Sequence, residues 1–240
     1  MITTIYRTAL LLVMLCTVAQ AAVVELDSDF DGKPDQWHHK KDDGDLEKME
    51  FDKNGDGKVD QIEIYDEGSK PSRVKLDRNF DGTFDQIQYY SKDFLLTKIE
   101  KDSQFSGIMD WHEFYDSDNK VSRLEIDQNG NGKIDVFQYF SENGKLLKIE
   151  FDTSHDGNID RWENFGKNEN LQSVAFDTNS DGNPDQWQYF ENSTLLQKVE
   201  HDSNYDGKID RWEYFNASGK VEKTELDRNY DGKVDLVKKE

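Results

Sequence analysis

The stretch Asp202-Ser-Asn-Tyr-Asp-Gly-Lys-Ile-Asp210 sets the pattern for most of this 240-residue chain. It places oxygen-bearing side chains at positions 1, 3, 5 and 9 and a glycine at position 6. The frame begins nine times, always 25 residues apart and always on aspartate: Asp27, Asp52, Asp77, Asp102, Asp127, Asp152, Asp177, Asp202 and Asp227. We number the repeats 1 to 9, and the positions in each repeat 1 to 25, from these aspartates. A fixed period of this length indicates a tandem-repeat architecture.

The residue types in the frame suit a hard divalent cation. Calcium takes six to eight oxygen ligands and tolerates irregular geometry. Side chains at positions 1, 3 and 5, together with the carbonyl of position 7, supply such ligands if position 6 adopts a conformation that glycine reaches easily. Position 6 is glycine and position 9 is aspartate in all nine repeats. The frame carries no soft ligand, which argues against zinc or copper.

We therefore predict that positions 1, 3, 5 and 9 bind calcium, up to about nine ions. Beyond the aspartates at position 1, the candidate ligands are Asp29, Asn54, Asn79, Asn129, Ser154, Asn179, Asn204 and Asn229 at position 3; Asp31, Asp56, Asp81, Asn131, Asp156, Asp181, Asp206 and Asp231 at position 5; and Asp35, Asp60, Asp85, Asp110, Asp135, Asp160, Asp185, Asp210 and Asp235 at position 9. Repeat 4 has Gln104 and Ser106 instead, so we expect its site to be the weakest or empty. Asn, Asp and Gly also favour plain turns, but a turn does not require aspartate at both positions 1 and 9 of every repeat.

The loop resembles the calcium loop of EF-hand proteins. Residues 52–63 and 202–213 fit the pattern Asp-x-[Asp/Asn]-x-[Asp/Asn]-Gly-x5-Glu. The tandem array also resembles thrombospondin type 3 repeats and the calcium loops of integrin-type propeller repeats. The resemblance covers about nine of every 25 residues and implies calcium binding. The EF-hand glutamate at position 12 is matched in the even repeats by Glu63, Glu113, Glu163 and Glu213, and Glu113 could partly compensate for the altered loop of repeat 4.

The residues between the loops predict a β-hairpin in each repeat. After a 12-residue loop only 13 residues remain, too few for two helices of ordinary length. In repeat 5, the β-prone segment 136–140 and the segment 145–151 flank a turn at Asn143-Gly144. Ile149 and Phe151 alternate with charged residues, so one face is apolar and the other charged. We expect an all-β, elongated, solenoid-like meander of roughly eighteen strands, in which calcium loops join the hairpins.

A second period of 50 residues leaves another architecture open. Position 12 is glutamate in even repeats and glutamine in repeats 3, 5 and 7, and Leu-Leu pairs recur in the odd repeats. Two repeats together could form a four-stranded blade of a β-propeller. In either architecture, residues 22–240 form a single repeat domain, because no linker or change of composition interrupts them.

Residues 1–21 have the features of a secretory signal peptide. Arg7 supplies the positive charge, Ala9–Ala19 is an apolar run, and Ala19-Gln-Ala21 fits a cleavage site. We expect a secreted, periplasmic or cell-surface protein, with no transmembrane segment in the mature chain. Cleavage changes the formal charge from −21 to −22, because Arg7 is the one charged residue in the leader. A chain this acidic is repelled by nucleic acid, and we expect none as a partner.

Calcium-dependent folding and rigidity, with a structural or adhesive role at the cell surface or envelope, is the function that these features favour. An alternative is a calcium-dependent module that binds an extracellular glycan or surface protein through an aromatic stripe, which contains Trp37, Tyr89, Phe114, Tyr139, Trp162, Trp187, Tyr189, Trp212 and Tyr214. A calcium buffer is a third possibility. No nucleophile or histidine motif indicates catalysis, so we do not expect an enzyme.

Overall fold

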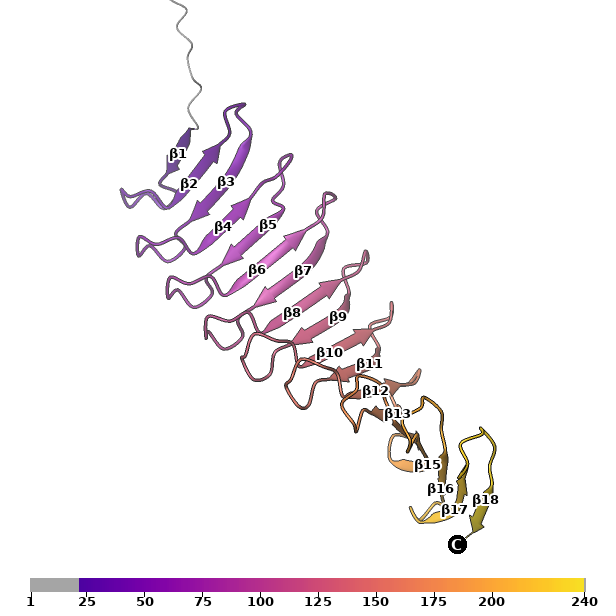
Figure 1. Ribbon diagram of the computed structural model, residues 1–240. Coiled ribbons are helices and arrows are strands. Elements are labelled where there is room, and N and C mark those ends of the chain that lie inside the picture. The colour runs from indigo at the N-terminus through magenta and orange to yellow at the C-terminus, as the bar shows by residue number, and fades with distance from the viewer. Residues whose placement is uncertain (1–21, 240) are drawn as a thin grey trace, which may run out of the picture.

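The computed structural model describes residues 22–239, which form one antiparallel sheet of 18 strands. The predicted leader, residues 1–21, lies outside the described residues. Each strand pairs with the strands that precede and follow it in the sequence (Figure 1). The strands are β1 (Val23–Leu26), β2 (Gln36–Lys40), β3 (Leu46–Phe51), β4 (Gln61–Ile64), β5 (Arg73–Leu76), β6 (Gln86–Tyr90), β7 (Leu96–Lys101), β8 (Trp111–Tyr115), β9 (Val121–Ile126), β10 (Val136–Phe140), β11 (Leu146–Phe151), β12 (Arg161–Phe165), β13 (Leu171–Phe176), β14 (Gln186–Glu191), β15 (Leu195–His201), β16 (Arg211–Phe215), β17 (Val221–Leu226) and β18 (Leu236–Lys239).

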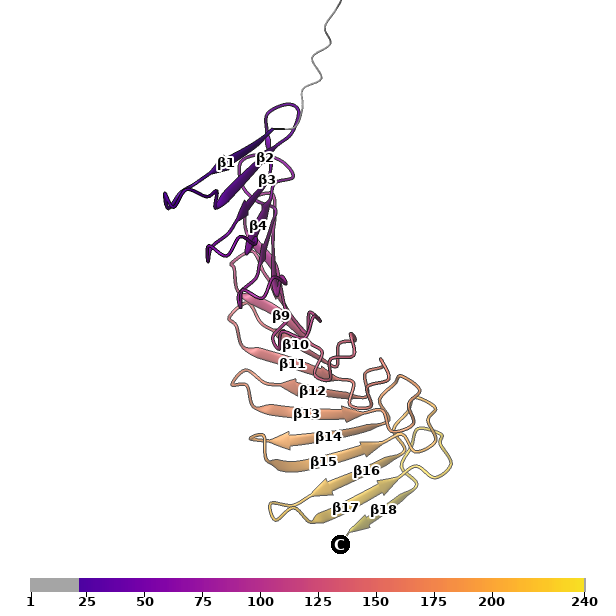
Figure 2. The ribbon, with the colours of Figure 1, turned by 90° about the vertical axis from the view of Figure 1, so that its left-hand side faces the viewer.

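The sheet is open and elongated, with β1 and β18 at opposite ends of a twisted, curved ribbon (Figure 2). This confirms the expected all-β hairpin array. It also excludes the blade architecture for the described part of the chain, because strand pairing continues from one repeat to the next. Lys101 of β7, for example, lies opposite Trp111 of β8 across the loop of repeat 4. Residues 22–239 contain no helix that could cross a membrane.

One hairpin register recurs along the sheet. The outgoing strand starts at position 10 and the returning strand ends at position 25. In repeat 3, Gln86 pairs with Lys101, and the pairing continues residue by residue to Tyr89 with Lys98. The register then shifts, so that Tyr90 lies opposite Leu96. Seven hairpins carry this shift between positions 13 and 14. Such irregularities increase the local twist of a sheet.

The two faces of the sheet differ in chemistry, as the alternation in repeat 5 predicts. The aliphatic face carries positions 10, 12, 14, 20, 23 and 25. Its centre is position 23, where five residues are buried: Val74, Ile99, Leu124, Val174 and Val199. Each lies between the position 12 side chains of two neighbouring strands, as Ile99 does between Gln88 and Glu113. With no second layer over it in the described chain, this face is covered by its own side chains.

The charged face carries positions 11, 13, 22 and 24, and includes all nine residues of the aromatic stripe. These rings are half-buried. In repeat 3, the hydroxyl of Tyr89 and the ammonium of Lys98 each donate to Glu100 at 2.6 Å. Burial alone would raise the pKa of Glu100, but these two hydrogen bonds outweigh it and lower the pKa. Burial and the bond to Glu100 raise the pKa of Tyr89 to about 12.

The Tyr89–Lys98–Glu100 contact predicts a pH-dependent effect of Glu100→Gln. The substitution should lower the free energy of unfolding by about 1–2 kcal/mol at pH 7, because it removes two charge-assisted hydrogen bonds. A carboxyl whose pKa is depressed by folding stabilises above its unfolded pKa of about 4.3, and this contribution is lost as the pH falls through the lower folded value. Urea unfolding followed by far-ultraviolet circular dichroism, at constant calcium, should show the penalty at pH 7 and a smaller one at pH 3.

The control is Glu142→Gln, at an exposed position in the turn between β10 and β11. It should change the stability at neither pH. An equal penalty for Glu100→Gln at both pH values would contradict the assigned charge interaction.

Candidate metal centre

The nine acidic loops form a row along one long edge of the sheet, and the hairpin turns form the other (Figure 1). Neighbouring loops are joined by a backbone hydrogen bond from the amide of position 1 to the carbonyl of position 9 in the preceding repeat. At the first junction the amide of Asp52 donates to the carbonyl of Asp35 at 2.9 Å, and all eight junctions show this bond at 2.8–3.0 Å. The sheet ladder thus extends into the loops and fixes their spacing.

The aspartate at position 1 organises each loop. Its Oδ2 accepts the amide of the position 6 glycine at 2.6–2.9 Å in all nine repeats. The glycine presents that amide only in a left-handed conformation; Gly207, for instance, has φ of +87°. An L-residue with a Cβ is strained there, which accounts for glycine at this position.

Positions 3 and 5 form a polar outer rim. Both positions are exposed in every loop. In repeat 8, Oδ1 of Asn204 accepts the amide of Asp206 at 3.1 Å, and Oδ1 of Asp206 accepts the amide of Lys208 at 3.0 Å. These are local Asx-type bonds, and each carbonyl or carboxylate oxygen keeps a free lone pair for a further partner.

The aspartate at position 9 closes the loop from inside. It accepts the amide of position 2 in all nine repeats, at 2.7–3.1 Å. A Ser or Thr hydroxyl at position 2 adds a second bond in repeats 1, 4, 6, 7 and 8. In repeat 3 the guanidinium of Arg78 takes the place of that hydroxyl and donates to Asp85. In repeat 5, Nδ1 of His155 lies 2.9 Å from Oδ1 of Asp135.

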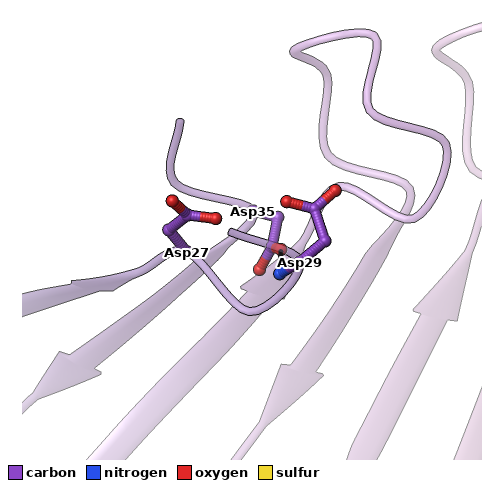
Figure 3. Close-up of side chains that lie close together, drawn as sticks. All are labelled: Asp27, Asp29 and Asp35. Carbon is purple, nitrogen blue, oxygen red and sulfur yellow. Dashed lines mark hydrogen bonds between the residues drawn. The ribbon is translucent and has the colours of Figure 1, made fainter. Parts of the chain in front are cut away.

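Repeat 1 brings its acidic side chains closest together. Potential ligand atoms of Asp27, Asp29 and Asp35 lie within 4.8 Å of one another (Figure 3). Asp31 is not part of this group. Oδ1 of Asp35 is buried and has no hydrogen-bond partner among the described residues. A cleft of about 480 Å³ lies beside this group, between the first two loops. A buried oxygen without a partner, next to two further carboxylates, is an arrangement that a bound cation would satisfy.

Most loops hold two buried carboxylates. Position 1 is buried in repeats 3 to 9, and position 9 in repeats 2 to 5, 7 and 8. Within residues 22–239, the ion pairs to these carboxylates are Arg78–Asp85 and His155–Asp135; the other partners are amides and hydroxyls. For Asp102, burial raises the pKa, but amide donors, including those of Ser106 and Gly107, outweigh it and lower the pKa. These amide donors favour the charged form of Asp102 although its side chain is buried.

Position 12 does not serve the loops. Its side chain lies on the aliphatic face, where Glu63 accepts the hydroxyl of Tyr65 at 2.6 Å and Arg161 donates to Glu163. Glu113 accepts bonds from Lys101, Trp111 and Tyr115. Compensation by Glu113 for the altered loop of repeat 4 is therefore wrong, because its oxygens are used within the sheet. Position 12 is the third residue of a strand here, whereas an EF-hand places it in a helix.

Position 4 carries a feature that the loop motif does not reveal. Aromatic residues stand there in five loops, with left-handed φ values of 56–63° and with 46–89% of each residue exposed: Phe30, Phe80, Phe105, Tyr205 and Tyr230. Gly55 and Gly130 occupy the same position in repeats 2 and 5. The left-handed conformation costs a non-glycine residue about 1–2 kcal/mol. In the sequence, this feature is visible as Phe or Tyr at position 4 in five of the nine repeats.

The comparisons with known proteins identify no family. No family model matches the chain, and no curated protein matches it. Among solved structures, a chain of accessory secretory protein 1, 2 and 3 in Streptococcus pneumoniae shares 14% identity at a TM-score of 0.32, over 50% of this chain and 19% of that chain. A porin-like protein from Bacteroides uniformis ATCC 8492 shares 10% identity at a TM-score of 0.25, over 85% of this chain and 86% of that one. This chain thus spans about a fifth of the first of these structures, and neither likeness is close enough to carry an argument.

The loop geometry predicts a clear cost for Gly207→Ala. The added Cβ meets no atom within 4 Å, so the cost comes from the backbone conformation and not from a clash. The free energy of unfolding should fall by about 1–2 kcal/mol, measured by urea unfolding with and without calcium. Lys208→Ala, at the adjacent exposed position, should change it by less than about 0.5 kcal/mol. Equal stability of wild type and Gly207→Ala would show that the loop is not held in this conformation in solution.

Proposed function

We propose that this chain is an exported calcium-binding repeat protein, whose loops bind calcium through positions 1, 3, 5 and 9. The observation that carries the proposal is the pair of buried aspartates in most loops, whose partners are mainly amides and hydroxyls. Burying a charge is costly unless it is paired. A divalent cation supplies the missing positive charge, and the exposed oxygens at positions 3 and 5 complete a hard-ligand set.

Metal binding and folding should be coupled in this protein. The mature chain would carry a formal charge of −22, and nine calcium ions would bring it to −4. The cation binds the folded loops better than the unfolded chain, so it stabilises the array by mass action. Extracellular calcium is often high enough to fill weak sites. We infer a structural or adhesive role, in which calcium rigidifies the row of loops at the cell surface or envelope.

A calcium titration followed by far-ultraviolet circular dichroism tests this proposal. The exported chain is first treated with chelator and then titrated with calcium, with magnesium as the control ion. We expect a cooperative gain of β-signal and a higher unfolding temperature with calcium alone. An unchanged β-spectrum and an unchanged unfolding temperature would overturn the coupling of metal to fold.

The double substitution Asp202→Asn and Asp210→Asn tests the assigned ligands. Both carboxylates are buried in repeat 8, and the amides preserve their shape while removing charge. Isothermal titration calorimetry should show one fewer bound calcium ion than in the wild type. Asp118→Asn, at an exposed hairpin turn away from the loops, should leave the number unchanged. If the double variant binds as many ions as the wild type, these side chains are not ligands.

A glycan-binding role is the second candidate, and the aromatic residues at position 4 favour it. The aromatic stripe on the sheet is half-buried and packed against lysine and glutamate, so it offers no flat open surface. The position 4 residues are exposed beside the oxygen-rich rims. Loops of adjacent repeats are two strands apart, about 10 Å, so Phe80 and Phe105 form a spaced pair at which a sugar chain can stack.

The double substitution Phe80→Ser and Phe105→Ser tests the second candidate. Retention on immobilised polysaccharides in calcium should fall, while the number of bound calcium ions stays the same. Tyr115→Phe, which keeps a half-buried ring on the sheet, serves as the control. Unchanged retention of the double variant, or no retention of the wild type, would count against glycan binding through these residues.

A further inference from the structure

The two edge strands of the sheet, β1 and β18, are unusually open. Each pairs with one neighbour among the described residues, β1 with β2 and β18 with β17. All four residues of β1 are exposed, with exposures of 51% for Val23, 41% for Val24 and 40% for Leu26. In β18, Val237 is 50% exposed. An edge strand presents a row of unpaired backbone groups that can pair with another chain.

The two edge strands are the two halves of one hairpin. Every complete hairpin in the described sheet pairs an outgoing strand that starts at position 10 with a returning strand that ends at position 25. Strand β18 occupies positions 10–13 of repeat 9. Strand β1 occupies positions 22–25 of the frame that precedes repeat 1. Within residues 22–239, each edge therefore offers the strand that the other lacks, with the same length and direction as the four-residue ladder inside each repeat.

The side chains of β1 match those of internal returning strands. Val24 stands at position 23, which is aliphatic at the buried centre of the sheet, and Leu26 stands at position 25, as do Leu76 and Leu226. Glu25 stands at position 24, the acidic position that Glu100 occupies in repeat 3. In an added hairpin, Leu236 would lie opposite Leu26, and Val237 opposite Glu25.

The charges of the two edges are also complementary. In internal hairpins, position 13 contacts the glutamate at position 24; His39 lies 2.6 Å from Glu50, and the hydroxyl of Tyr214 donates to Glu225 at 2.9 Å. Lys239 is the position 13 residue of β18, so pairing with β1 places its ammonium beside Glu25. Pairing of β18 with the β18 of another copy would instead bring Lys238 and Lys239 of one copy close to the same two lysines of the other. Contact between like charges is unfavourable.

The loops next to the two edge strands can make the same contact that joins neighbouring loops inside the chain. Inside the chain, the amide of position 1 donates to the carbonyl of position 9 in the preceding repeat. At the edges these groups belong to Asp27 of repeat 1 and Asp235 of repeat 9. Asp235 is the one position 9 aspartate that is exposed in the described chain. A neighbouring repeat 1 would cover it, as each internal repeat covers the loop before it.

We propose that β18 of one copy pairs with β1 of a second copy, in the register of the internal hairpins, and joins copies head to tail. The contact is heterologous, since two different surfaces meet, and an open sheet has no means of closing on itself within one copy. Repetition therefore gives a filament in which the sheet continues from copy to copy. One copy adds 18 strands, a length along the sheet of about 90 Å.

Charge reversal in the exported chain, in saturating calcium, tests the proposal. Sedimentation velocity of the wild type should show association that grows with concentration. Glu25→Lys and Lys239→Glu should each weaken it by about tenfold or more, because each sets like charges opposite one another at the junction. An equimolar mixture of the two variants should associate again, since each junction then joins opposite charges. Lys167→Glu, in an exposed turn far from both edges, should behave as wild type.

Disulfide trapping gives a second readout that does not depend on charge. Val24→Cys and Lys238→Cys are made separately in the exported chain, from which the leader with Cys16 has been removed, and are mixed under oxidising conditions. The register places these positions opposite one another, so the mixed disulfide dimer should dominate over either homodimer. A wild type that stays monomeric at all concentrations, a mixture that does not associate, or a predominance of homodimers would overturn the proposal. Because circular dichroism and calcium binding are measured separately, failure of the junction remains distinguishable from failure of the calcium sites.

Discussion

The loops along one edge of the sheet depend on hydrogen bonds in which backbone amides donate to aspartate carboxylates. Two strands from successive repeats must be joined across a loop that reverses the chain, and the loop has no apolar core of its own. The carboxylates at positions 1 and 9 replace that core: Asp202 binds the amide of Gly207 and Asp210 that of Ser203. Amides that would otherwise be unpaired are satisfied, and two negative charges are concentrated in each loop. The architecture therefore concentrates negative charge along one edge of the sheet.

A single-layer sheet has to cover both faces with its own side chains, and this chain does so in two ways. On the aliphatic face, a central line of residues such as Val174 is buried between flanking side chains of the same face. On the charged face, lysine stems lie over aromatic rings; Nζ of Lys223 is 3.7 Å from the ring centroid of Tyr214. Long basic side chains cover apolar area while keeping their charge in water. Alternating lysine and glutamate thus replace the second layer that an ordinary sheet acquires from helices or another sheet.

Much of this could be predicted from the sequence, because the informative signals are local. Strand alternation around Ile149 and Phe151 gave the hairpins, and a 25-residue period without insertions gave the repeat. The choice between a continuous sheet and separate blades is not local. It depends on whether Lys101 and Trp111 pair across a loop, and both architectures use the same hairpin. The 50-residue period is compatible with a continuous sheet. Glutamate at position 12 alternates with glutamine, so glutamates such as Glu113 and Glu163 do not stand on adjacent repeats.

The loop motif alone does not determine where position 12 points, because its surroundings differ from those of an EF-hand. Position 12 ligates when a helix turns it back toward the loop, but in a strand begun at position 10 its side chain points onto a sheet face. Because successive side chains of a strand point to opposite faces, positions 11 and 13 lie on the charged face, where Trp162 and its counterparts are found. The nine-residue motif does not specify which face each of these residues occupies. The face follows from the residue at which the strand begins. The position 4 residues are also not predicted by the motif. A phenylalanine such as Phe80 rarely adopts a left-handed conformation, and its ring is usually buried, whereas here it is exposed.

The connectivity of the array also shapes how its stability is distributed. Within residues 22–239, each repeat contacts only the repeats on either side, so cooperativity has to pass from neighbour to neighbour. The links available are the strand ladder, the bond between the amide of Asp52 and the carbonyl of Asp35 and its equivalents, and cross-loop contacts such as that of Lys133 with the carbonyl of Asp156. A cation that fixes one loop fixes the position 9 carbonyl to which the next loop is attached. Order in the loops and order in the sheet are therefore not separable. Within residues 22–239, the repeats at the two edges have one neighbour each and are the least supported parts of the sheet.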